Sequence, residues 1–323
     1  MPIKSLIDEL LAAAVQDKSS DIYVLPRAQA YYIHLRQTQT VRLWREVTTD
    51  VGQQLLTYFK FHADMAVSEH RRPQVGALTW PTVTGHLELR FSTVGDYAGR
   101  ESLVIRVIYP YQTLQLDYLE TGQRQQLGDL AQQRGLMLFA GPTGAGKTTT
   151  MYTTARHLTA KAVVLSIEDP VEIKEPHFIQ LQVNASAGMT YDELIKVGLR
   201  HRPDAFIIGE IRDALTAQAA IRAALSGHLV LSTVHARSAA GTISRLLDLG
   251  VAQTQLRQVL TAACYQRLIP RQQQGSAVLL EILAGAALWS PTTNPRERWR
   301  HSLEQARMAG TISQQTYQTY AAG

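Results

Sequence analysis

The feature that most constrains this chain lies at residues 141–149, which read Gly-Pro-Thr-Gly-Ala-Gly-Lys-Thr-Thr. This segment matches the full G-x4-G-K-[ST] pattern of a phosphate-binding loop, and it follows the apolar run 136–140. Glycines at 141, 144 and 146 let the backbone curl around an anion, so that N–H groups and a helix N-terminus point at phosphate oxygens. The pattern and its context predict a nucleoside triphosphate site.

The loop residues have different expected tasks. Lys147 is placed to meet the β and γ phosphates, and the hydroxyl of Thr148 is placed to hold Mg²⁺. The alternative, a glycine-rich turn that binds nothing, is weakened by the strand before the loop and the helix after it. The residues expected to contact the nucleotide are Gly141, Pro142, Thr143, Gly144, Ala145, Gly146, Lys147, Thr148 and Thr149.

Length and composition allow two domains with at least one sizeable core, since the chain has 323 residues of which 45% are hydrophobic. Asp8 and Glu9 interrupt the first apolar stretch, unlike a secretory signal. The longest apolar run, 277–289, contains Glu281 and falls short of the ~20 residues of a membrane span. The single cysteine, Cys264, excludes a multi-cysteine zinc site and fits a reducing cytoplasm, where we interpret it as a core residue.

The formal net charge of +5 leaves nucleic acid or an anionic membrane surface open as partners. The basic residues are scattered, however, and the densest sets are Arg71-Arg72 and the arginines at 296, 298 and 300. No platform of interleaved aromatic residues accompanies them. We therefore expect a solvated or protein-docking face, and no direct binding of nucleic acid.

The first third of the chain has the pattern of an α+β domain. Residues 3–16 carry apolar side chains at the spacing of an amphipathic helix, and 51–61 has the same character. Short alternating segments predict strands at 22–25, 31–35, 41–44, 77–80, 86–92 and 103–108. We expect a compact α+β domain at 1–109, followed by a linker and hinge at 110–118.

Beyond the linker, helices and strands alternate, which predicts parallel strands joined by crossover helices. The strands are expected at 136–140, 163–167, 205–208 and 229–233. The helices are expected near 123–134, 147–159, 191–201, 214–226 and 252–268, with a polar helical tail after Pro295. The second domain, 119–323, is therefore expected to be α/β with a mainly parallel sheet.

Carboxylates follow two of the predicted strands. Glu168 begins an acidic turn after strand 163–167, at the sheet edge where open parallel sheets bind ligands. It could hold Mg²⁺, directly or through water, or polarise an attacking water, although a solvated acidic turn is the alternative. After strand 205–208, Gly209 stands where common hydrolysing NTPases have an aspartate. Glu210 is then the best candidate to orient the water.

Two histidines flank strand 229–233. His228 precedes the strand, at the end away from the phosphates, and its role is left open. His235 follows the strand at the ligand-binding edge. Lone histidines are often structural, so His235 is the stronger candidate for the site and His228 the weaker one.

Four segments occur in an order that resembles a known superfamily. They are the extended phosphate loop 141–152, Ser-Ile-Glu-Asp-Pro-Val-Glu at 166–172, Arg-Pro-Asp-Ala-Phe-Ile-Ile-Gly-Glu-Ile-Arg-Asp at 202–213, and Gly-His-Leu-Val-Leu-Ser-Thr-Val-His at 227–235. Together they resemble the secretion ATPases that power type II secretion, type IV pili and competence pseudopili. Ser-Ser-Asp-Ile-Tyr-Val-Leu-Pro at 19–26 extends the resemblance over most of the chain.

The resemblance implies ATP with Mg²⁺, and a RecA-like phosphate-loop NTPase domain preceded by a smaller PAS-like domain. It also implies that two first-domain arginines, here Arg90 and Arg106, reach the nucleotide. The planar, permanently charged guanidinium suits this task because it can neutralise charge on the transferring phosphoryl group. A homo-hexameric ring is implied at the cytoplasmic face of the membrane, where it would work on a polytopic platform protein and a pseudopilin system.

Departures from the superfamily pattern narrow the choice. Residues 36–39 read Arg-Gln-Thr-Gln in place of Arg-x-Asp-Gly, and 271–274 read Arg-Gln-Gln-Gln, without the cysteine tetrad of the type II secretion ATPases. The extra N-terminal domains of those enzymes and the C-terminal element of the retraction motors are also not found. The chain most resembles the competence pseudopilus assembly ATPases of Gram-positive bacteria, the ComGA type.

We therefore expect an ATP-hydrolysing motor that powers assembly of a competence-type pseudopilus for DNA uptake. One alternative is a type IV pilus or type II secretion motor of the same superfamily, acting in assembly or in retraction. A nucleic-acid motor and a non-hydrolysing ring that senses ATP are two further alternatives. The presence of both Glu168 and Glu210 argues against the ring that only senses ATP.

Overall fold

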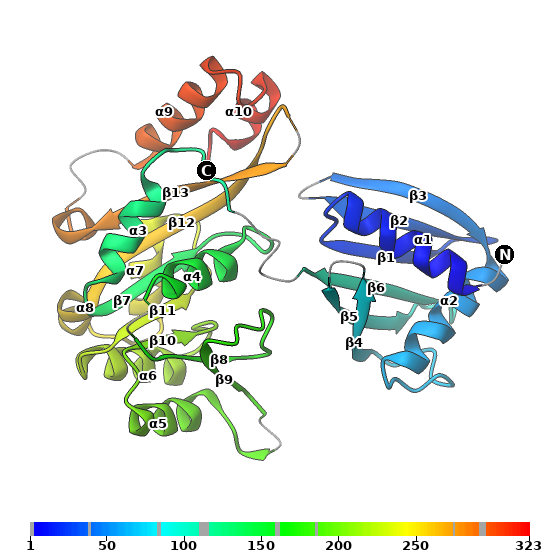
Figure 1. The fold of residues 1–323 in the computed structure, drawn as a ribbon, viewed down its shortest axis with the longest axis horizontal. Coiled ribbons are helices and arrows are strands. Elements are labelled where there is room, and N and C mark those ends of the chain that lie inside the picture. Colours follow the sequence, from blue (N-terminus) through cyan, green and yellow to red (C-terminus); the bar gives the residue numbers. More distant parts are fainter. Residues whose placement is uncertain are drawn as a thin grey trace. The chain divides into compact units, whose positions relative to one another are not determined.

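The computed structural model describes residues 3–37, 40–82, 85–109, 116–158, 162–184, 187–273, 275–290 and 295–323. The chain divides into two compact units, Met1–Leu114 and Gln115–Gly323 (Figure 1). Each unit is described by itself. Most of the predicted linker, 110–115 of 110–118, lies outside the described residues, so its role as a hinge stays a prediction.

The described residues of the first unit form one antiparallel sheet and two helices. Its sheet has the order β3-β2-β1-β6-β5-β4, and every neighbouring pair is antiparallel. The elements are α1 (Ile3–Gln16), β1 (Asp21–Pro26), β2 (Ala30–Gln37), β3 (Thr40–Thr48), α2 (Thr49–His62), β4 (Gln74–Thr82), β5 (Gly85–Gly95) and β6 (Glu101–Ile108). The predicted helices and strands of this region are confirmed, with strands a few residues longer than expected.

The core of the first unit lies between the two helices and one face of the sheet. In α1 the buried residues are Leu6, Ile7, Leu10, Leu11 and Ala14, the spacing of one helical face. Along β2 every second residue from Tyr31 to Leu35 is buried. This alternation buries one face of the sheet and leaves the other to polar and aromatic side chains.

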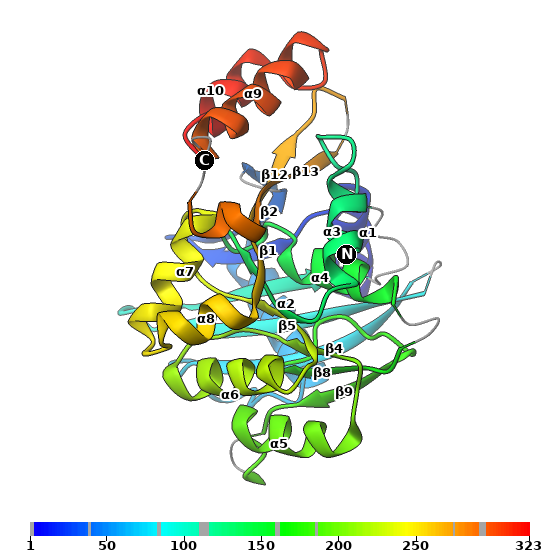
Figure 2. The same cartoon turned by 90° about the vertical axis from the view of Figure 1, so that its left-hand side faces the viewer.

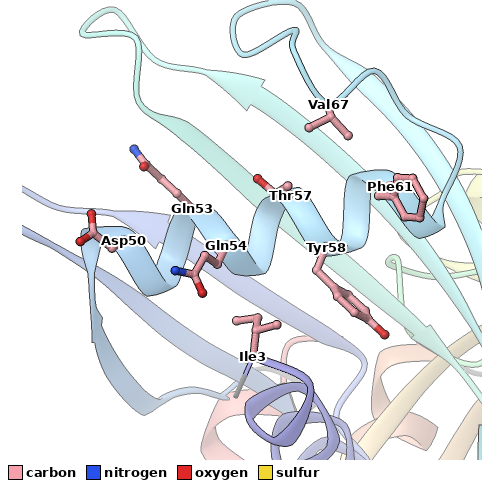
Figure 3. Close-up of a pocket in the computed structure, with 8 residues that line it drawn as sticks. All are labelled: Ile3, Asp50, Gln53, Gln54, Thr57, Tyr58, Phe61 and Val67. Carbon is pink, nitrogen blue, oxygen red and sulfur yellow. The ribbon is translucent and has the colours of Figure 1, made fainter. Parts of the chain in front are cut away.

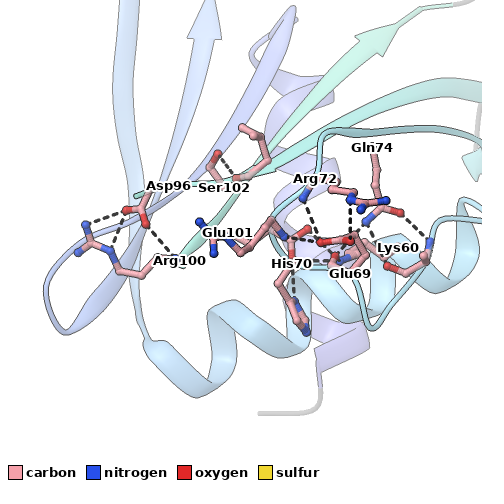
Figure 4. Close-up of polar contacts among 12 residues, drawn as sticks. Lys60, Glu69, His70, Arg72, Gln74, Asp96, Arg100, Glu101 and Ser102 are labelled. Atoms are coloured by element: carbon pink, nitrogen blue, oxygen red, sulfur yellow. Dashed lines mark hydrogen bonds and ion pairs between the residues drawn. The ribbon is translucent and has the colours of Figure 1, made fainter. Parts of the chain in front are cut away.

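A buried ion pair ties the end of α2 to β6 (Figure 4). Nζ of Lys60 lies 2.8 and 3.0 Å from the two carboxylate oxygens of Glu101, and it also donates to the backbone carbonyl of Glu69. Nδ1 of His70 lies 3.0 Å from Oε2 of Glu101. Because an unpaired charge in a core is costly, this cluster holds the segment between α2 and β4 against the sheet.

A pocket of about 690 Å³ runs along the outer side of α2 (Figure 3). It is open to solvent, and the ring of Phe61 beside it is exposed. Its lining residues are Ile3, Asp50, Gln53, Gln54, Thr57, Tyr58, Phe61 and Val67. None of the residues predicted to act on a nucleotide is among them.

The second unit contains, in the part of the chain that the structure describes, a seven-stranded sheet of order β13-β12-β7-β11-β10-β8-β9. All neighbouring pairs are parallel except β12 with β13. The strands are β7 (Gly135–Ala140), β8 (Val164–Glu168), β9 (Phe178–Gln182), β10 (Ala205–Ile208), β11 (Leu229–Thr233), β12 (Leu260–Pro270) and β13 (Ser276–Ala284). This is the predicted α/β class, and β7, β8, β10 and β11 match the predicted strands.

Helices cover this sheet, and every residue of its interior strand β7 is buried. The helices are α3 (Gln123–Ala131), α4 (Lys147–Arg156), α5 (Tyr191–His201), α6 (Ala214–Leu225), α7 (Ala239–Asp248), α8 (Gln253–Val259), α9 (Pro295–Met308) and α10 (Gln314–Tyr320), with a 3-10 turn at Gly285–Leu288. Helices α6, α7 and α8 lie together on one side of the sheet (Figure 2). Among the described residues, no helix combines the length and apolarity needed to cross a bilayer.

One predicted helix is wrong over most of its length. Residues 252–268 were expected to be helical, but α8 ends at Val259 and strand β12 begins at Leu260. The strand pairs with β7 on one edge and with β13 on the other, and most residues on both of its faces are buried, so its sequence is a nearly continuous apolar run. Such a run has no period that separates a buried strand from a buried helix. Helix α7 and strands β9 and β13 were not predicted.

The segment from Asp117 onward, which includes the last two residues of the predicted linker, is hydrogen-bonded to the free edge of β13. The backbone N–H of Leu119 donates to Val278, and the N–H of Val278 donates to Asp117. The side-chain amide of Gln123 then bonds both the carbonyl (2.7 Å) and the N–H (3.0 Å) of Leu280. The side chain of Gln123 therefore extends the hydrogen bonding along the edge of β13 in place of a backbone.

Candidate nucleotide site

The phosphate-binding loop connects β7 to α4, as predicted. Its three glycines have positive φ angles, 146° at Gly141, 77° at Gly144 and 80° at Gly146. A Cβ atom at Gly141 would lie 2.3 Å from the backbone oxygen of Gln266, closer than any real contact allows. The loop path therefore requires glycine there for both its backbone angle and its surroundings.

Lys147 is folded onto this loop. Its Nζ donates to the backbone carbonyls of Gly141 (2.9 Å) and Pro142 (3.0 Å). Burial lowers the pKa of Lys147, whereas the nearby carboxylates of Glu210 and Glu172 act in the opposite direction. The ammonium group thus lies at the loop, within the electrostatic reach of the predicted catalytic carboxylate Glu210.

Thr148 lies in the first turn of α4 and is half-buried. Its hydroxyl is an oxygen donor of the kind Mg²⁺ prefers. Among the described residues, no cluster of three or more His, Cys, Asp or Glu side chains could hold a metal. The hydroxyl of Thr148 beside a phosphate-binding loop fits Mg²⁺, which is usually held by few protein ligands together with water and phosphate oxygens.

Gln266 supports the phosphate-binding loop from a neighbouring strand, and the sequence did not predict this role. It lies on β12, which pairs with β7 as far as Tyr265 opposite Ala140. Its Nε2 donates to the carbonyl of Ala145 at 2.6 Å, and its side chain is completely buried. The sequence contained one signal, a polar residue within an apolar run. Because 252–268 was expected to be a helix, this signal did not point to the phosphate-binding loop.

Glu168 ends β8 and is buried, with 3% of its surface exposed, so it is not part of a solvated turn. The hydroxyl of Tyr152 on α4 donates to its Oε1. Burial raises the pKa of Glu168, while the hydrogen bond from Tyr152 lowers it. The next residue, Asp169, is exposed, so the solvated turn begins only there.

Glu210 follows β10 and has a cationic partner. Nε of Arg212 donates to its Oε2 at 2.6 Å, and Nε2 of His235 lies 2.8 Å from its Oε1. His235 follows β11, the strand beside β10. The structure therefore brings Glu210 and His235 together, as expected for neighbouring parallel strands that end at one edge.

Gly209 leaves room for Glu168. A Cβ atom at position 209 would lie 3.2 Å from the hydroxyl of Tyr191 and 3.4 Å from Cγ of Glu168. A side chain at this position would therefore already contact Glu168 at its Cβ atom and would crowd the hydroxyl of Tyr191. Asp213, in the same segment, accepts a hydrogen bond from the N–H of Thr216 and caps α6, so its task is structural.

His228 lies at the other end of its strand. Its Nδ1 is 3.0 Å from the carbonyl of Ala223, and its ring meets Phe206 edge to face at 5.3 Å between centroids. These contacts give His228 a packing role.

The two predicted arginines of the first unit face each other across β5 and β6, because Arg90 and Arg106 are paired in the register. Nε of Arg106 donates to Oδ1 of Asp21, at 3.2 Å, and Asp21 is its register partner on β1. The three charged residues thus form one row across neighbouring strands. That the arginines reach a nucleotide stays a prediction.

The sequence as a whole matches one family. The family model described as Type II/IV secretion system protein covers residues 1–315. The chain belongs to this family. It is 44% identical over 268 residues to the "Competence protein ComGA" of Streptococcus pneumoniae strain R6, which covers 83% of this chain and 85% of that protein. It is also 39% identical over 273 residues to the "Competence protein ComGA" of Bacillus subtilis strain 168, and this alignment covers 83% of this chain and 76% of that protein.

Among solved structures, the X-ray structure of the Legionella pneumophila ATPase DotB has a similar fold. Its TM-score is 0.77 at 19% identity, over 99% of this chain and 96% of that chain. The predicted resemblance to the type II/IV secretion family is confirmed, and so is the predicted fold class. This member of the family is an ATPase, as its phosphate-binding loop indicates.

Proposed function

We propose that this chain hydrolyses ATP to power the assembly of a competence-type pseudopilus for DNA uptake. The observation that carries the proposal is the convergence of Lys147, Glu168, Glu210 and His235 on the carboxyl ends of neighbouring strands, beside the phosphate-binding loop. The competence proteins among its relatives support the biological role.

The roles of the site residues follow from their surroundings. Lys147 binds the phosphates in place of the two loop carbonyls that it now contacts. Glu210 accepts a hydrogen bond from the attacking water, and Arg212 holds the carboxylate in place by donating to its Oε2. Glu168 supplies a second carboxylate on the same edge, from a buried position. His235 orients Glu210 through its Nε2.

Thr148 would hold Mg²⁺, with Glu168 contributing directly or through water. A cation held there would supply positive charge that offsets the charge of the phosphate oxygens. The residues of the chain then bind the nucleotide, orient water and exclude bulk solvent.

The first unit contributes Arg90 and Arg106 to the phosphates in this proposal. Their fixed positive charge opposes the charge that develops on the transferring group. Working as a homo-hexamer at the cytoplasmic face of the membrane, the ring would drive a polytopic platform protein that stacks pseudopilins. Changes between the two domains during the ATP cycle would supply the stroke.

The proposal is tested in the native host, in a strain deleted for this gene and complemented with wild type or Glu210→Gln. Wild type should restore surface pseudopili and DNA uptake, and the variant should restore neither while being present at the same level. Restored pseudopili with the hydrolysis-deficient variant would contradict the proposal. Purified protein whose ATP turnover rises strongly with DNA would instead favour a nucleic-acid motor.

A further inference from the structure

A one-directional chain of hydrogen bonds lies behind the phosphate-binding loop and ends on Glu168. Its central member is Tyr152, whose side chain is 1% exposed and whose hydroxyl donates to Oε1 of Glu168. Nε2 of Gln180, on the edge strand β9, lies 2.8 Å from the same hydroxyl. The three residues come from α4, β8 and β9, so the chain connects a helix with two strands.

The direction of each bond is determined by Gln180. Its Oε1 accepts the backbone N–H of Glu175 at 2.8 Å, which fixes which end of the amide is oxygen. Its Nε2 donates to the carbonyl of Ile173, also at 2.8 Å, and to the hydroxyl of Tyr152. Since an amide nitrogen only donates, the hydroxyl oxygen must accept this bond. The single proton of Tyr152 is therefore directed to Glu168.

The ring of Tyr152 is also held in place, by packing. It packs on Phe178 with 5.2 Å between ring centroids. Tyr152 also follows Thr148 by four residues on α4, so the two lie on the same face of the helix one turn apart. The hydroxyl thus keeps a constant relation to the first turn of the helix that carries Lys147 and Thr148.

We propose that Tyr152 is a positioning residue that sets the orientation of the Glu168 carboxylate relative to the phosphate-binding loop, and that Gln180 fixes the direction of its hydrogen bond. The inference rests on the proposed role of Glu168 in hydrolysis. Without the hydroxyl, the carboxylate would be buried without this donor and could rotate away from its productive geometry.

The test is steady-state ATP hydrolysis by the full chain carrying Tyr152→Phe, which keeps the ring and removes the hydroxyl. We expect kcat to fall about tenfold, the size of one lost charge-assisted hydrogen bond, with KM for ATP within about twofold of wild type. In a Glu168→Gln background, the same substitution should cause no further loss, because its effect passes through Glu168.

Two other variants complete the test, one as a control and one as a second measurement. Tyr31→Phe removes a buried tyrosine hydroxyl bond of 3.0 Å to the backbone of Glu101 in the first unit, and should leave turnover unchanged. Gln180→Met keeps the hydroxyl of Tyr152 but removes the donor that directs it, and should lower kcat in the same direction by a smaller factor. It gives a second measurement if Tyr152→Phe folds poorly.

The outcomes separate the two claims. If Glu168→Gln lowers kcat while Tyr152→Phe and Gln180→Met do not, the positioning role is wrong and the proposed site stands. If Tyr152→Phe lowers kcat equally with and without Glu168→Gln, it acts elsewhere and the inference is also wrong. Full turnover in Glu168→Gln would overturn both the inference and the role of Glu168.

Discussion

The side-chain amide of Gln266 donates to the backbone carbonyl of Ala145, 2.6 Å away and within the phosphate-binding loop. Gln266 belongs to β12, more than a hundred residues further along the chain, and its backbone oxygen lies where a side chain at Gly141 would have to go. The loop is therefore shaped by a neighbouring strand as well as by its own glycines.

Substitution Gln266→Leu should weaken ATP binding. Leucine is similar in size but leaves the buried carbonyl of Ala145 without this donor, which costs about 1–3 kcal/mol and frees the loop. We expect ATP affinity to fall about fivefold or more, measured by titration with a fluorescent ATP analogue. An unchanged dissociation constant would show that the loop keeps its shape without β12.

Substitution Lys147→Ala should abolish nucleotide binding. The ammonium is the cation that contacts the loop carbonyls, and no other side chain of the loop can replace its charge at the phosphates. Binding is measured by calorimetry with a non-hydrolysable ATP analogue. The exposed Lys174 offers a matched control, since Lys174→Ala should bind like wild type.

Glu210→Gln should bind ATP and fail to hydrolyse it. The amide keeps the shape of the side chain but is a poor acceptor for the proton of the attacking water. Phosphate release should fall by a factor of about 100 or more while nucleotide affinity stays within a few-fold. Unchanged turnover in this variant would remove Glu210 from its role.

The buried pair Lys60–Glu101 gives a prediction for stability. Glu101→Gln leaves the buried ammonium of Lys60 without its counter-charge and should lower the free energy of unfolding by about 3–5 kcal/mol. The double variant Lys60→Met/Glu101→Leu removes both charges and should recover most of that loss. Urea unfolding of the full chain measures both, and an equal loss in single and double variants would contradict this account.

The parts of the site that the sequence predicts are those encoded in short continuous segments. The phosphate-binding loop, Glu168, Glu210 and His235 each come within two residues of the end of a predicted strand, so their common edge follows from the rules of parallel sheets. The pairing of Glu210 with His235 was not predicted, since it depends on β10 and β11 being neighbours in the sheet.

The parts that the sequence does not predict depend on contacts between distant segments. Gln266 reaches the loop only because β12 pairs with β7, and the apolar sequence of β12 does not distinguish a strand from a helix. The direction of the Tyr152 hydroxyl depends on Gln180 and, through it, on a backbone N–H at Glu175. No periodicity or motif carries such information.

The attachment of residues 117–123 to β13 has a mechanical consequence. Tyr118 runs parallel to β13 opposite Val278, so a force applied in the strand direction to the chain before Asp117 would load the bonds on either side together. Bonds loaded in shear must break at the same time, whereas bonds that are peeled break one by one. The second unit is thus built to receive tension at its first residues without fraying, and the amide of Gln123 adds two further bonds to the same seam.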